Sequence, residues 1–166
     1  MQLTELHPSD FSHLQDLMGR SKKVNVYRQD AWQGLKAMLP PAEKRGLVLI
    51  DPSYEVKQDY KTIVSALQLA HKRFSTGIFA IWYPVLERKA TEQFIDQLAG
   101  AGIRNMLRIE QSVLPDVERG MTGSGMIVVN PPYTLKTDME MALPVLNKFL
   151  GEGDSGHTIL EQLTEE

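Results

Sequence analysis

Short apolar runs alternate along this chain with amphipathic helical patterns, and neither an internal repeat nor a proline-rich linker interrupts the alternation. The β-type runs lie at 2–6, 24–28, 46–50, 77–83, 105–113 and 125–130. The helical patterns run from Phe11 to Met18, from Trp32 to Leu39, from Tyr60 to Phe74 and from Leu86 to Leu98. Continuous apolar runs such as LVLI suit parallel strands that are covered on both faces. The sequence therefore predicts an α/β fold with an open, doubly wound sheet.

The last two β-type runs are expected to pair in a different direction from the others. The segment between 105–113 and 125–130 is too short and too rich in glycine to hold a crossover helix, so these strands should be antiparallel. A mostly parallel sheet with an antiparallel closing hairpin resembles the Rossmann-like class I S-adenosylmethionine-dependent methyltransferases. A last helix is expected near 137–150, kinked or shortened by Pro144. We expect one domain over residues 1–150 and a polar carboxyl-terminal tail over 151–166.

Composition excludes several classes of protein. With 166 residues, 42% of them hydrophobic and 23% charged, the chain has the makeup of one globular domain. No apolar run reaches the length of a membrane span and no basic-then-apolar leader opens the chain, so we expect a cytoplasmic protein without a membrane partner. The sequence has no cysteine and its four histidines show no ligand spacing, which predicts no metal site.

Acidic residues lie at or just after the ends of three successive β-type runs: Glu5, Asp30 and Asp51. Ligands of open α/β sheets bind beyond the carboxyl ends of the strands, where these residues are expected. One such carboxylate can accept hydrogen bonds from both hydroxyls of a ribose, and the next can accept one from the amino group of an adenine. In the alternative interpretation Asp30 and Asp51 only cap helices, with Pro52 in the first helical position.

Two similar stretches compete for the role of active site, GLVLIDPSYE beginning at Gly46 and GMIVVNPPYT beginning at Gly125. Asp/Asn-Pro-Pro-Tyr is typical of enzymes that methylate the exocyclic amino group of a base. A catalytic strand needs further helices and parallel strands after it, and only the first stretch has them. Position therefore selects Asp51-Pro52-Ser53-Tyr54, and the sequence predicts that Asn130 begins a turn.

The chemistry of amino methylation suits these residue types. The lone pair of an adenine N6 is delocalised into the ring until acceptors hold the hydrogens of the amino group. The Asp51 carboxylate and the Pro52 carbonyl provide two such acceptors, and Tyr54 provides a stacking face for the base. Trp82 and Tyr83 either flank the base or belong to the core.

Several longer runs carry a resemblance to a known family: QLTELHPSD from Gln2, RGLVLIDPSYE from Arg45, WYPV from Trp82, VLPD from Val113 and RGMTGSGMIVVNPP from Arg119. They resemble the bacterial RlmJ family, the adenine-N6 methyltransferases of 23S ribosomal RNA. The resemblance extends from Gln2 to about Leu150 and covers only the carboxyl-terminal portion of that family. The motif of the family is D-P-P-Y, so Ser53 departs from it.

This resemblance implies a role for each site residue. Glu5 would bind the ribose of S-adenosylmethionine, Asp30 with Ala31 would contact its adenine end, and Asp51 with Pro52 and Tyr54 would act on an adenine of 23S ribosomal RNA. The first strand of the family's fold and its glycine-rich loop have no counterpart in this sequence. Because that strand is central, we expect weak or no binding of the cofactor by this chain alone and an open sheet edge that a second copy of the chain can pair with.

Two alternatives remain open from the residues. The chain can be a catalytically inactive remnant that binds nucleic acid or protein, which the missing loop and Ser53 favour. It can also belong to an adenine-N6 methyltransferase that acts on DNA, because DNA and RNA present the same adenine edge.

Overall fold

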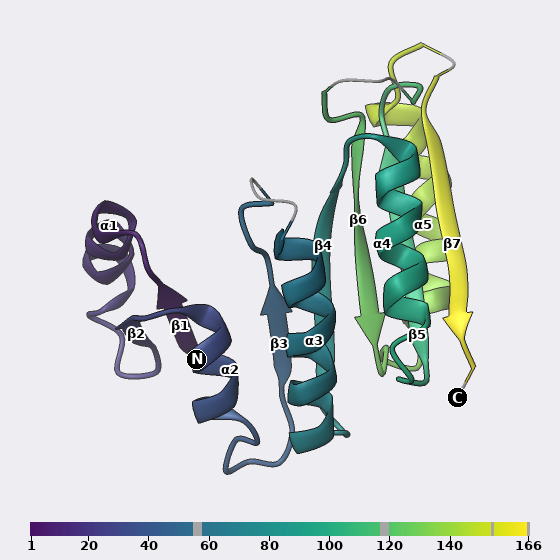
Figure 1. Cartoon of the computed structure of the whole chain (residues 1–166). Coiled ribbons are helices and arrows are strands. Elements are labelled where there is room, and N and C mark those ends of the chain that lie inside the picture. Colours follow the sequence, from purple (N-terminus) through teal and green to yellow (C-terminus); the bar gives the residue numbers. More distant parts are fainter. Residues whose placement is uncertain (55–57, 117–119, 154, 166) are drawn as a thin grey trace. The chain divides into compact units, whose positions relative to one another are not determined.

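The computed structural model describes residues 1–54, 58–116, 120–153 and 155–165, and the chain divides into two compact units, Met1–Pro41 and Ala42–Glu166 (Figure 1). We refer to them as unit 1 and unit 2. The sequence predicts no boundary near residue 41. The division arises because the described strands form two separate sheets, one of two strands and one of five.

Unit 1 is a β-α-β-α segment with strands β1 (Gln2–Glu5) and β2 (Asn25–Arg28) and helices α1 (Pro8–Met18) and α2 (Ala31–Met38). The two strands are parallel, with Glu5 paired to Arg28. Asp30 caps α2, because its Oδ1 accepts a hydrogen bond of 2.9 Å from the backbone N–H of Gln33. Because β1 and β2 are parallel, both strands end on the same side of unit 1.

Unit 2 contains the rest of the secondary structure. Its strands are β3 (Leu47–Ile50), β4 (Ile78–Val85), β5 (Met106–Ser112), β6 (Gly123–Val129) and β7 (His157–Thr164). Its helices are α3 (Gln58–Arg73), α4 (Arg88–Ala99) and α5 (Leu135–Leu150). The predicted strands agree with the observed ones to within two residues at each end.

The sheet of unit 2 has the strand order β3-β4-β6-β5-β7. β3 and β4 are parallel, whereas β6 runs antiparallel to both β4 and β5. The predicted antiparallel hairpin of the last two β-type runs is thus confirmed. The fold is α/β, but its sheet is mixed rather than mostly parallel, because β6 lies between β4 and β5 and β7 adds a further antiparallel neighbour to β5.

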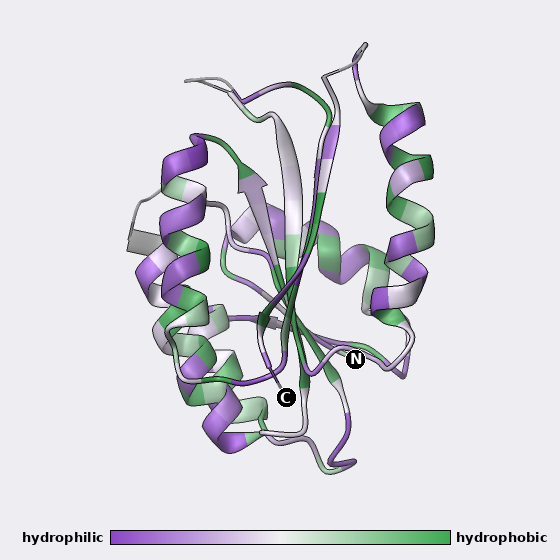
Figure 2. Cartoon of the chain, turned by 90° about the vertical axis from the view of Figure 1, so that its right-hand side faces the viewer, coloured by the Kyte–Doolittle hydropathy of each residue, from purple (hydrophilic) through white to green (hydrophobic). Residues whose placement is uncertain are grey.

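The core of unit 2 forms where helices cover the two faces of the sheet. Figure 1 shows α3 and α4 on one face and α5 on the other, and Figure 2 shows hydrophobic residues concentrated in the strands between them. Alternate residues of β4 are fully buried on one face, as the period of two in a strand requires. The largest fully buried side chains of the described residues are Tyr83 and Phe79 of β4 and Phe94 of α4, followed by Ile63 and Leu67 of α3.

The carboxyl-terminal segment does not form the polar tail expected from its sequence. Residues His157–Thr164 form β7, which pairs antiparallel with β5 along its whole length. Every residue of β7 except Glu161 is half-buried, so the strand covers the edge of β5 without a continuous apolar run. An edge strand with only partial burial needs few large apolar residues, which is why its sequence resembles a tail.

Among the residues that the structure describes, no helix combines the length and the apolarity that a membrane-spanning segment needs.

Candidate functional site

Asp51, Pro52 and Tyr54 follow β3 directly and lie at the carboxyl edge of unit 2, the side on which β3, β4 and β5 all end. The Asp51 side chain is exposed and Pro52 is half-buried. No helix begins at Pro52, because residues 51–54 have no regular structure and α3 starts only at Gln58. Capping of an adjacent helix therefore does not account for Asp51.

Tyr54 is a buried anchor in this structure. It is 7% exposed, and its φ of 57° turns the chain sharply after Ser53. Its hydroxyl donates a hydrogen bond to the backbone carbonyl of Trp82, next to the end of β4. Its ring packs against Tyr60 and Trp82 with centroid distances of 5.2 and 5.9 Å. Stacking of a base on Tyr54 therefore requires its ring to turn outward.

Glu5, Asp30 and Ala31 lie in unit 1, at the end where β1 and β2 finish. Glu5 Oε1 accepts a hydrogen bond of 2.7 Å from the backbone N–H of His7, and Asp30 is the cap of α2. Both carboxylates are half-buried, and Ala31 is exposed at the start of the helix. The structure thus places Glu5 and Asp30 on one side of unit 1, and Asp51, Pro52 and Tyr54 on one side of unit 2.

The second stretch, NPPY at Asn130, lies at the opposite side of unit 2. The Asn130 side chain donates two hydrogen bonds of 2.8 Å, to the carbonyls of Ser75 and Gly77, just before β4 begins. Its φ of 52° ends β6 in a tight turn. Tyr133 is fully exposed. Because β6 is antiparallel to β4, Asp51 and Asn130 lie at opposite ends of the sheet.

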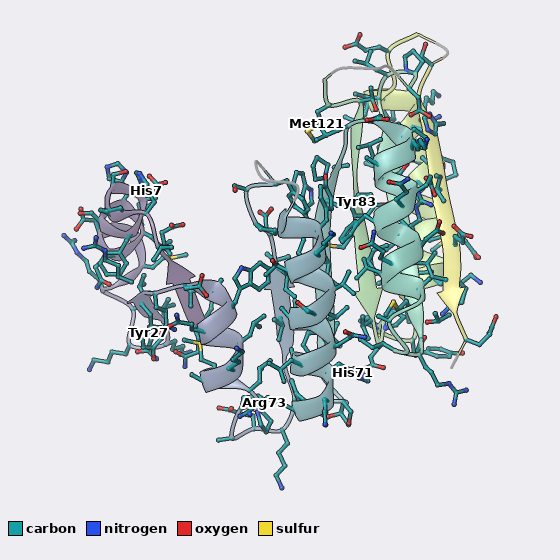
Figure 3. The ribbon with its side chains drawn as sticks, in the orientation of Figure 1. His7, Tyr27, His71, Arg73, Tyr83 and Met121 are labelled. Atoms are coloured by element: carbon teal, nitrogen blue, oxygen red, sulfur yellow. The ribbon has the colours of Figure 1, made fainter. Side chains whose placement is uncertain are left out.

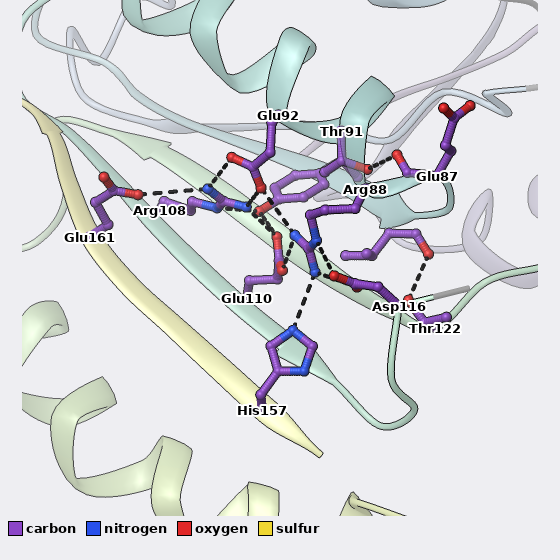
Figure 4. A network of polar contacts seen from close by, with 12 residues as sticks. Glu87, Arg88, Thr91, Glu92, Arg108, Glu110, Asp116, Thr122, His157 and Glu161 are labelled. Atoms are coloured by element: carbon purple, nitrogen blue, oxygen red, sulfur yellow. Dashed lines mark hydrogen bonds and ion pairs between the residues drawn. The ribbon is translucent and has the colours of Figure 1, made fainter. Parts of the chain in front are cut away.

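A network of charged side chains that was not predicted from the sequence lies between α4 and the sheet (Figure 4). The Glu110 side chain is completely buried. It accepts hydrogen bonds from Arg88 Nη1 at 2.7 Å, from Arg108 Nη2 at 2.8 Å and from the Tyr83 hydroxyl at 2.8 Å. Arg108 also binds both oxygens of Glu92, at 2.7 and 3.0 Å.

The sequence contains a signal for this network. Arg108 and Glu110 are two residues apart in a strand, so they share a face, and Arg88 and Glu92 are four apart in a helix. Charges at these spacings normally indicate a solvated surface, and only the packing of α4 on the sheet reveals that they are buried. The network also shows that Tyr83 belongs to the core, where burial beside Glu110 raises its pKa.

The carboxylates at the rim of the network make its contribution to stability depend on pH. Hydrogen bonds from Arg108 lower the pKa of Glu92, and hydrogen bonds from Arg88 lower the pKa of Asp116. A lowered folded-state pKa adds stability above the unfolded-state values of 4.5 and 3.8, and this stability is lost as the pH falls through the folded-state values.

Burial also lowers the pKa of His71, so stability begins to fall as the pH drops through its unfolded-state value of 6.5. We therefore expect the free energy of unfolding to decline below about pH 6.5 and to decline further below about pH 5, where Glu92 and Asp116 take up protons. Urea unfolding at a series of pH values measures this dependence. An Asp116→Asn variant should show a shallower decline, because it has one carboxylate fewer to protonate. An equally steep decline in the variant would exclude Asp116 as a source of the acid sensitivity.

No group of three or more histidine, aspartate and glutamate side chains is arranged to hold a metal ion in the described parts of the chain.

Comparison with known proteins supports the resemblance noted in the sequence. The family model described as "Ribosomal RNA large subunit methyltransferase D, RlmJ" matches residues 1–164. Two proteins named ribosomal RNA large subunit methyltransferase J are similar to the chain. The one from Escherichia coli (strain K12) is 47% identical over all of the chain, and the one from Haemophilus influenzae is 49% identical over 99% of it.

A solved structure agrees with the fold. The crystal structure of a protein from Legionella pneumophila matches 97% of this chain with a TM-score of 0.89 and 40% sequence identity. The match covers 60% of that chain, and our chain spans 60% and 59% of the lengths of the two named relatives. Since the family model covers nearly every residue, the chain belongs to the RlmJ family of ribosomal RNA large subunit methyltransferases.

Proposed function

We propose that this chain is part of an enzyme that transfers a methyl group from S-adenosylmethionine to N6 of an adenine in 23S ribosomal RNA. The observation that carries the proposal is the exposed Asp51 in a D-P-x-Y motif at the carboxyl end of β3, in a member of this family. The activity of the whole enzyme is a proposal for this chain, which is shorter than the named relatives.

Asp51 is assigned the central role in the transfer. Its carboxylate accepts one hydrogen of the N6 amino group and the Pro52 carbonyl accepts the other, which directs the nitrogen lone pair out of the ring plane. When bound, S-adenosylmethionine would supply an electrophilic methyl group, with S-adenosylhomocysteine as the leaving group. The Asp51 carboxylate would accept the surplus proton that N6 carries after the transfer.

Tyr54 and Trp82 are assigned to the substrate base. The hydrogen bond from Tyr54 to the Trp82 carbonyl ties the D-P-x-Y segment to β4, and the two rings are already in edge contact. If the Tyr54 ring turns outward and gives up its contact with Tyr60, an adenine would stack on it with a stabilisation of about 1–3 kcal/mol. Ser53 takes the place of the family's second proline and leaves the segment less rigid.

Glu5, Asp30 and Ala31 are assigned to the ribose and adenine of the cofactor. Each carboxylate uses one oxygen in a local hydrogen bond, and an ionised carboxylate has further acceptor sites for ribose hydroxyls or an amino group. These residues fit the nucleoside part of S-adenosylmethionine. The sequence contains no glycine-rich loop after a strand that would hold its remainder.

The edge of the unit 2 sheet at β3 favours pairing with an additional strand. Among the described strands, β3 is the last of its sheet, and Leu47 and Leu49 on one of its faces are 66% and 62% exposed. An uncovered strand with exposed leucines invites pairing and packing by another segment. We propose a class I methyltransferase fold whose first strand is not part of this chain, with the free edge of β3 as its place or as the contact of a homo-oligomer.

A catalytically inactive binding remnant is the second candidate, and the lack of the glycine-rich loop favours it. Titration calorimetry with S-adenosylhomocysteine separates the two. We expect weak, saturable binding by this chain that Glu5→Gln weakens further, because a ribose acceptor is lost. Glu43→Gln, an exposed change of the same charge in unit 2, serves as the control and should bind like the parent.

The same samples should be assayed for methyl transfer to protein-free 23S ribosomal RNA. Binding and transfer together support the proposal. A folded chain that neither binds S-adenosylhomocysteine nor transfers a methyl group would support the inactive remnant instead.

A further inference from the structure

The Tyr54 ring contacts two other aromatic side chains of unit 2. Its centroid lies 5.2 Å from that of Tyr60, in the first turn of α3, and 5.9 Å from that of Trp82, in β4. Its hydroxyl donates a hydrogen bond to the backbone carbonyl of Trp82. Two ring contacts and a hydrogen bond at the tip therefore hold the Tyr54 side chain inward, at an edge of the sheet where Asp51 is exposed.

Tyr60 is fixed in turn by the core of unit 2. Its ring centroid lies 4.9 Å from that of Phe94, in an edge-to-face arrangement. Phe94 is almost completely buried, and its ring lies 6.3 Å from that of the buried Tyr83. Edge-to-face pairs at such distances are favourable beyond the apolar area that they bury. A continuous row of ring contacts runs from the core through Tyr60 to Tyr54, so Tyr60 keeps its place when the Tyr54 ring moves.

The backbone of Tyr54 also depends on these contacts. Its φ of 57° lies in the left-handed region, which is unfavourable for a residue with a large side chain. Such conformations are found at ligand sites and persist only where the surrounding structure stabilises them. The ring contacts and the hydrogen bond of the hydroxyl provide this stabilisation. The fold of unit 2 therefore favours the inward position of Tyr54.

The contact with Tyr60 and stacking of a substrate base on Tyr54 exclude each other, because stacking requires the ring to turn outward. The apparent affinity for a base is the intrinsic affinity multiplied by the fraction of molecules in which the ring is already outward. Binding of the phosphate backbone does not need this movement. The contacts of Tyr54 therefore control the part of RNA binding that depends on the base.

We propose that Tyr60 is a positioning residue that holds the Tyr54 ring inward, so that the ring is released only to a base whose stacking replaces this contact. The inference rests on the proposed function, because it takes an adenine of an RNA as the ligand. Tyr60 acts through Tyr54 and not on the base.

Acrylamide quenching of Trp82 fluorescence reports the position of the Tyr54 ring, and it needs neither RNA nor cofactor. In a Trp32→Phe background Trp82 is the only tryptophan. Tyr54→Ala uncovers the Trp82 ring and gives the quenching constant expected for the outward position. We expect Tyr60→Ala to raise the quenching constant at least about halfway to that value. Tyr60→Phe keeps the ring and should match the parent.

Phe74→Leu is the control for a general loss of packing. Phe74 follows the other end of α3, is 4% exposed and lies 6.3 Å from another aromatic ring of the core. Figure 3 shows His71 and Arg73, just before it in the chain, toward the lower end of unit 2, whereas Tyr83 lies nearer the upper end. This variant should lower the stability of unit 2 and leave the quenching of Trp82 unchanged.

Fluorescence anisotropy with two labelled RNA stem-loops measures the effect on the base, without any methyl donor in the sample. One stem-loop has an unpaired adenine, and the other is abasic at that position. Tyr60→Ala removes the ring contact, and Tyr54→Phe removes the hydroxyl that binds the Trp82 carbonyl but keeps the stacking ring. We expect each variant to lower the Kd for the adenine RNA about three- to tenfold and to leave the Kd for the abasic RNA unchanged. A residue with only a structural role would not increase the affinity when it is removed.

A quenching constant of Tyr60→Ala equal to that of the parent would overturn the inference. A Kd for the adenine RNA that stays the same or rises in both Tyr60→Ala and Tyr54→Phe would overturn it as well, as would equal affinities of the parent for the two RNAs. The quenching measurement is independent of the calorimetric titration with S-adenosylhomocysteine and of the methyl-transfer assay. A failure of the positioning role is therefore distinguishable from a failure of the proposed function.

Discussion

Replacing Glu110 with alanine is expected to destabilise unit 2 by about 3–5 kcal/mol, the cost of breaking a buried ion pair by removing one partner. Glu110 is fully buried and is the acceptor that Arg88, Arg108 and Tyr83 share. Without it, Arg108 keeps Glu92 but remains nearly buried, at 4% exposure, with one carboxylate fewer. The Tyr83 hydroxyl also loses its acceptor inside the core.

The two tryptophans allow this effect to be measured in unit 2 alone. Trp32 lies in unit 1 and Trp82 in unit 2, so a Trp32→Phe background leaves a single fluorescent reporter in the unit that contains Glu110. Urea unfolding followed by Trp82 fluorescence then gives the free energy of unfolding of unit 2.

Glu161→Ala is the matched control for this measurement. Glu161 also contacts Arg108, at 3.6 Å, but its side chain is 53% exposed, so its loss should cost less than about 1 kcal/mol. If Glu110→Ala lowers the free energy of unfolding by no more than Glu161→Ala does, burial of a carboxylate does not determine how much it contributes to stability. Glu110→Gln should lie between the two, because it keeps the shape of the side chain and loses the charge.

The strands and helices were predictable because their hydrophobic periods are clear. Parallel strands such as LVLI carry an uninterrupted apolar run, and glycines in the segment before β6 indicated the antiparallel hairpin. β7 was not predicted, since its residues are half-buried and its sequence, HTILEQLT, mixes polar and apolar residues. The division after Pro41 was not predicted either, because it depends on which strands pair, and hydrogen bonds between distant strands leave no local pattern.

The positions of the candidate site residues were predictable only where they depend on the ends of the strands. The rule that ligands bind beyond the carboxyl ends of strands selected Glu5, Asp30 and Asp51. In the structure Glu5 is the last residue of β1, Asp30 lies two residues after β2 and Asp51 follows β3 directly. The packing of Tyr54 against Tyr60 and Trp82 depends on the three-dimensional arrangement of α3 and β4. Arg88 and Asp116 are 28 residues apart, and nothing in their spacing indicates a bidentate pair.

Replacing Asp51 with alanine is expected to lower the rate of methyl transfer by about 10²–10⁴-fold, the usual contribution of a positioned acid or base. Asp51 is exposed and the described residues that follow it, 52–54, are not helical, so the stability of unit 2 should change by less than about 0.5 kcal/mol. The assay measures transfer of labelled methyl groups from S-adenosylmethionine to 23S ribosomal RNA at high cofactor concentration. Unfolding of the same sample shows that the variant remains folded.

The isosteric variant separates the two roles that Asp51 is given. Asp51→Asn keeps a carbonyl oxygen that accepts a hydrogen bond from N6 but has no carboxylate to take the proton. An activity between those of the parent and Asp51→Ala means that orientation and proton acceptance both contribute. Activity equal to that of the parent means that the residue only orients the amino group, as expected if the proton leaves to water after the methyl transfer.

The second motif, NPPY, provides a control for the location of the catalytic residue. Asn130 begins NPPY, the closer match to the family of amino-methylation motifs, yet its side chain bonds to the carbonyls of Ser75 and Gly77 at the opposite end of the sheet. Asn130→Ala should therefore cost about 1–2 kcal/mol of stability through those two hydrogen bonds and leave the methyl-transfer rate of the folded protein unchanged. If Asn130→Ala abolishes transfer while Asp51→Ala does not, the catalytic residue has been assigned to the wrong strand. Comparing the two variants shows which motif is catalytic: NPPY at Asn130, the closer sequence match, or DPSY at Asp51, which lies at the carboxyl end of a parallel strand.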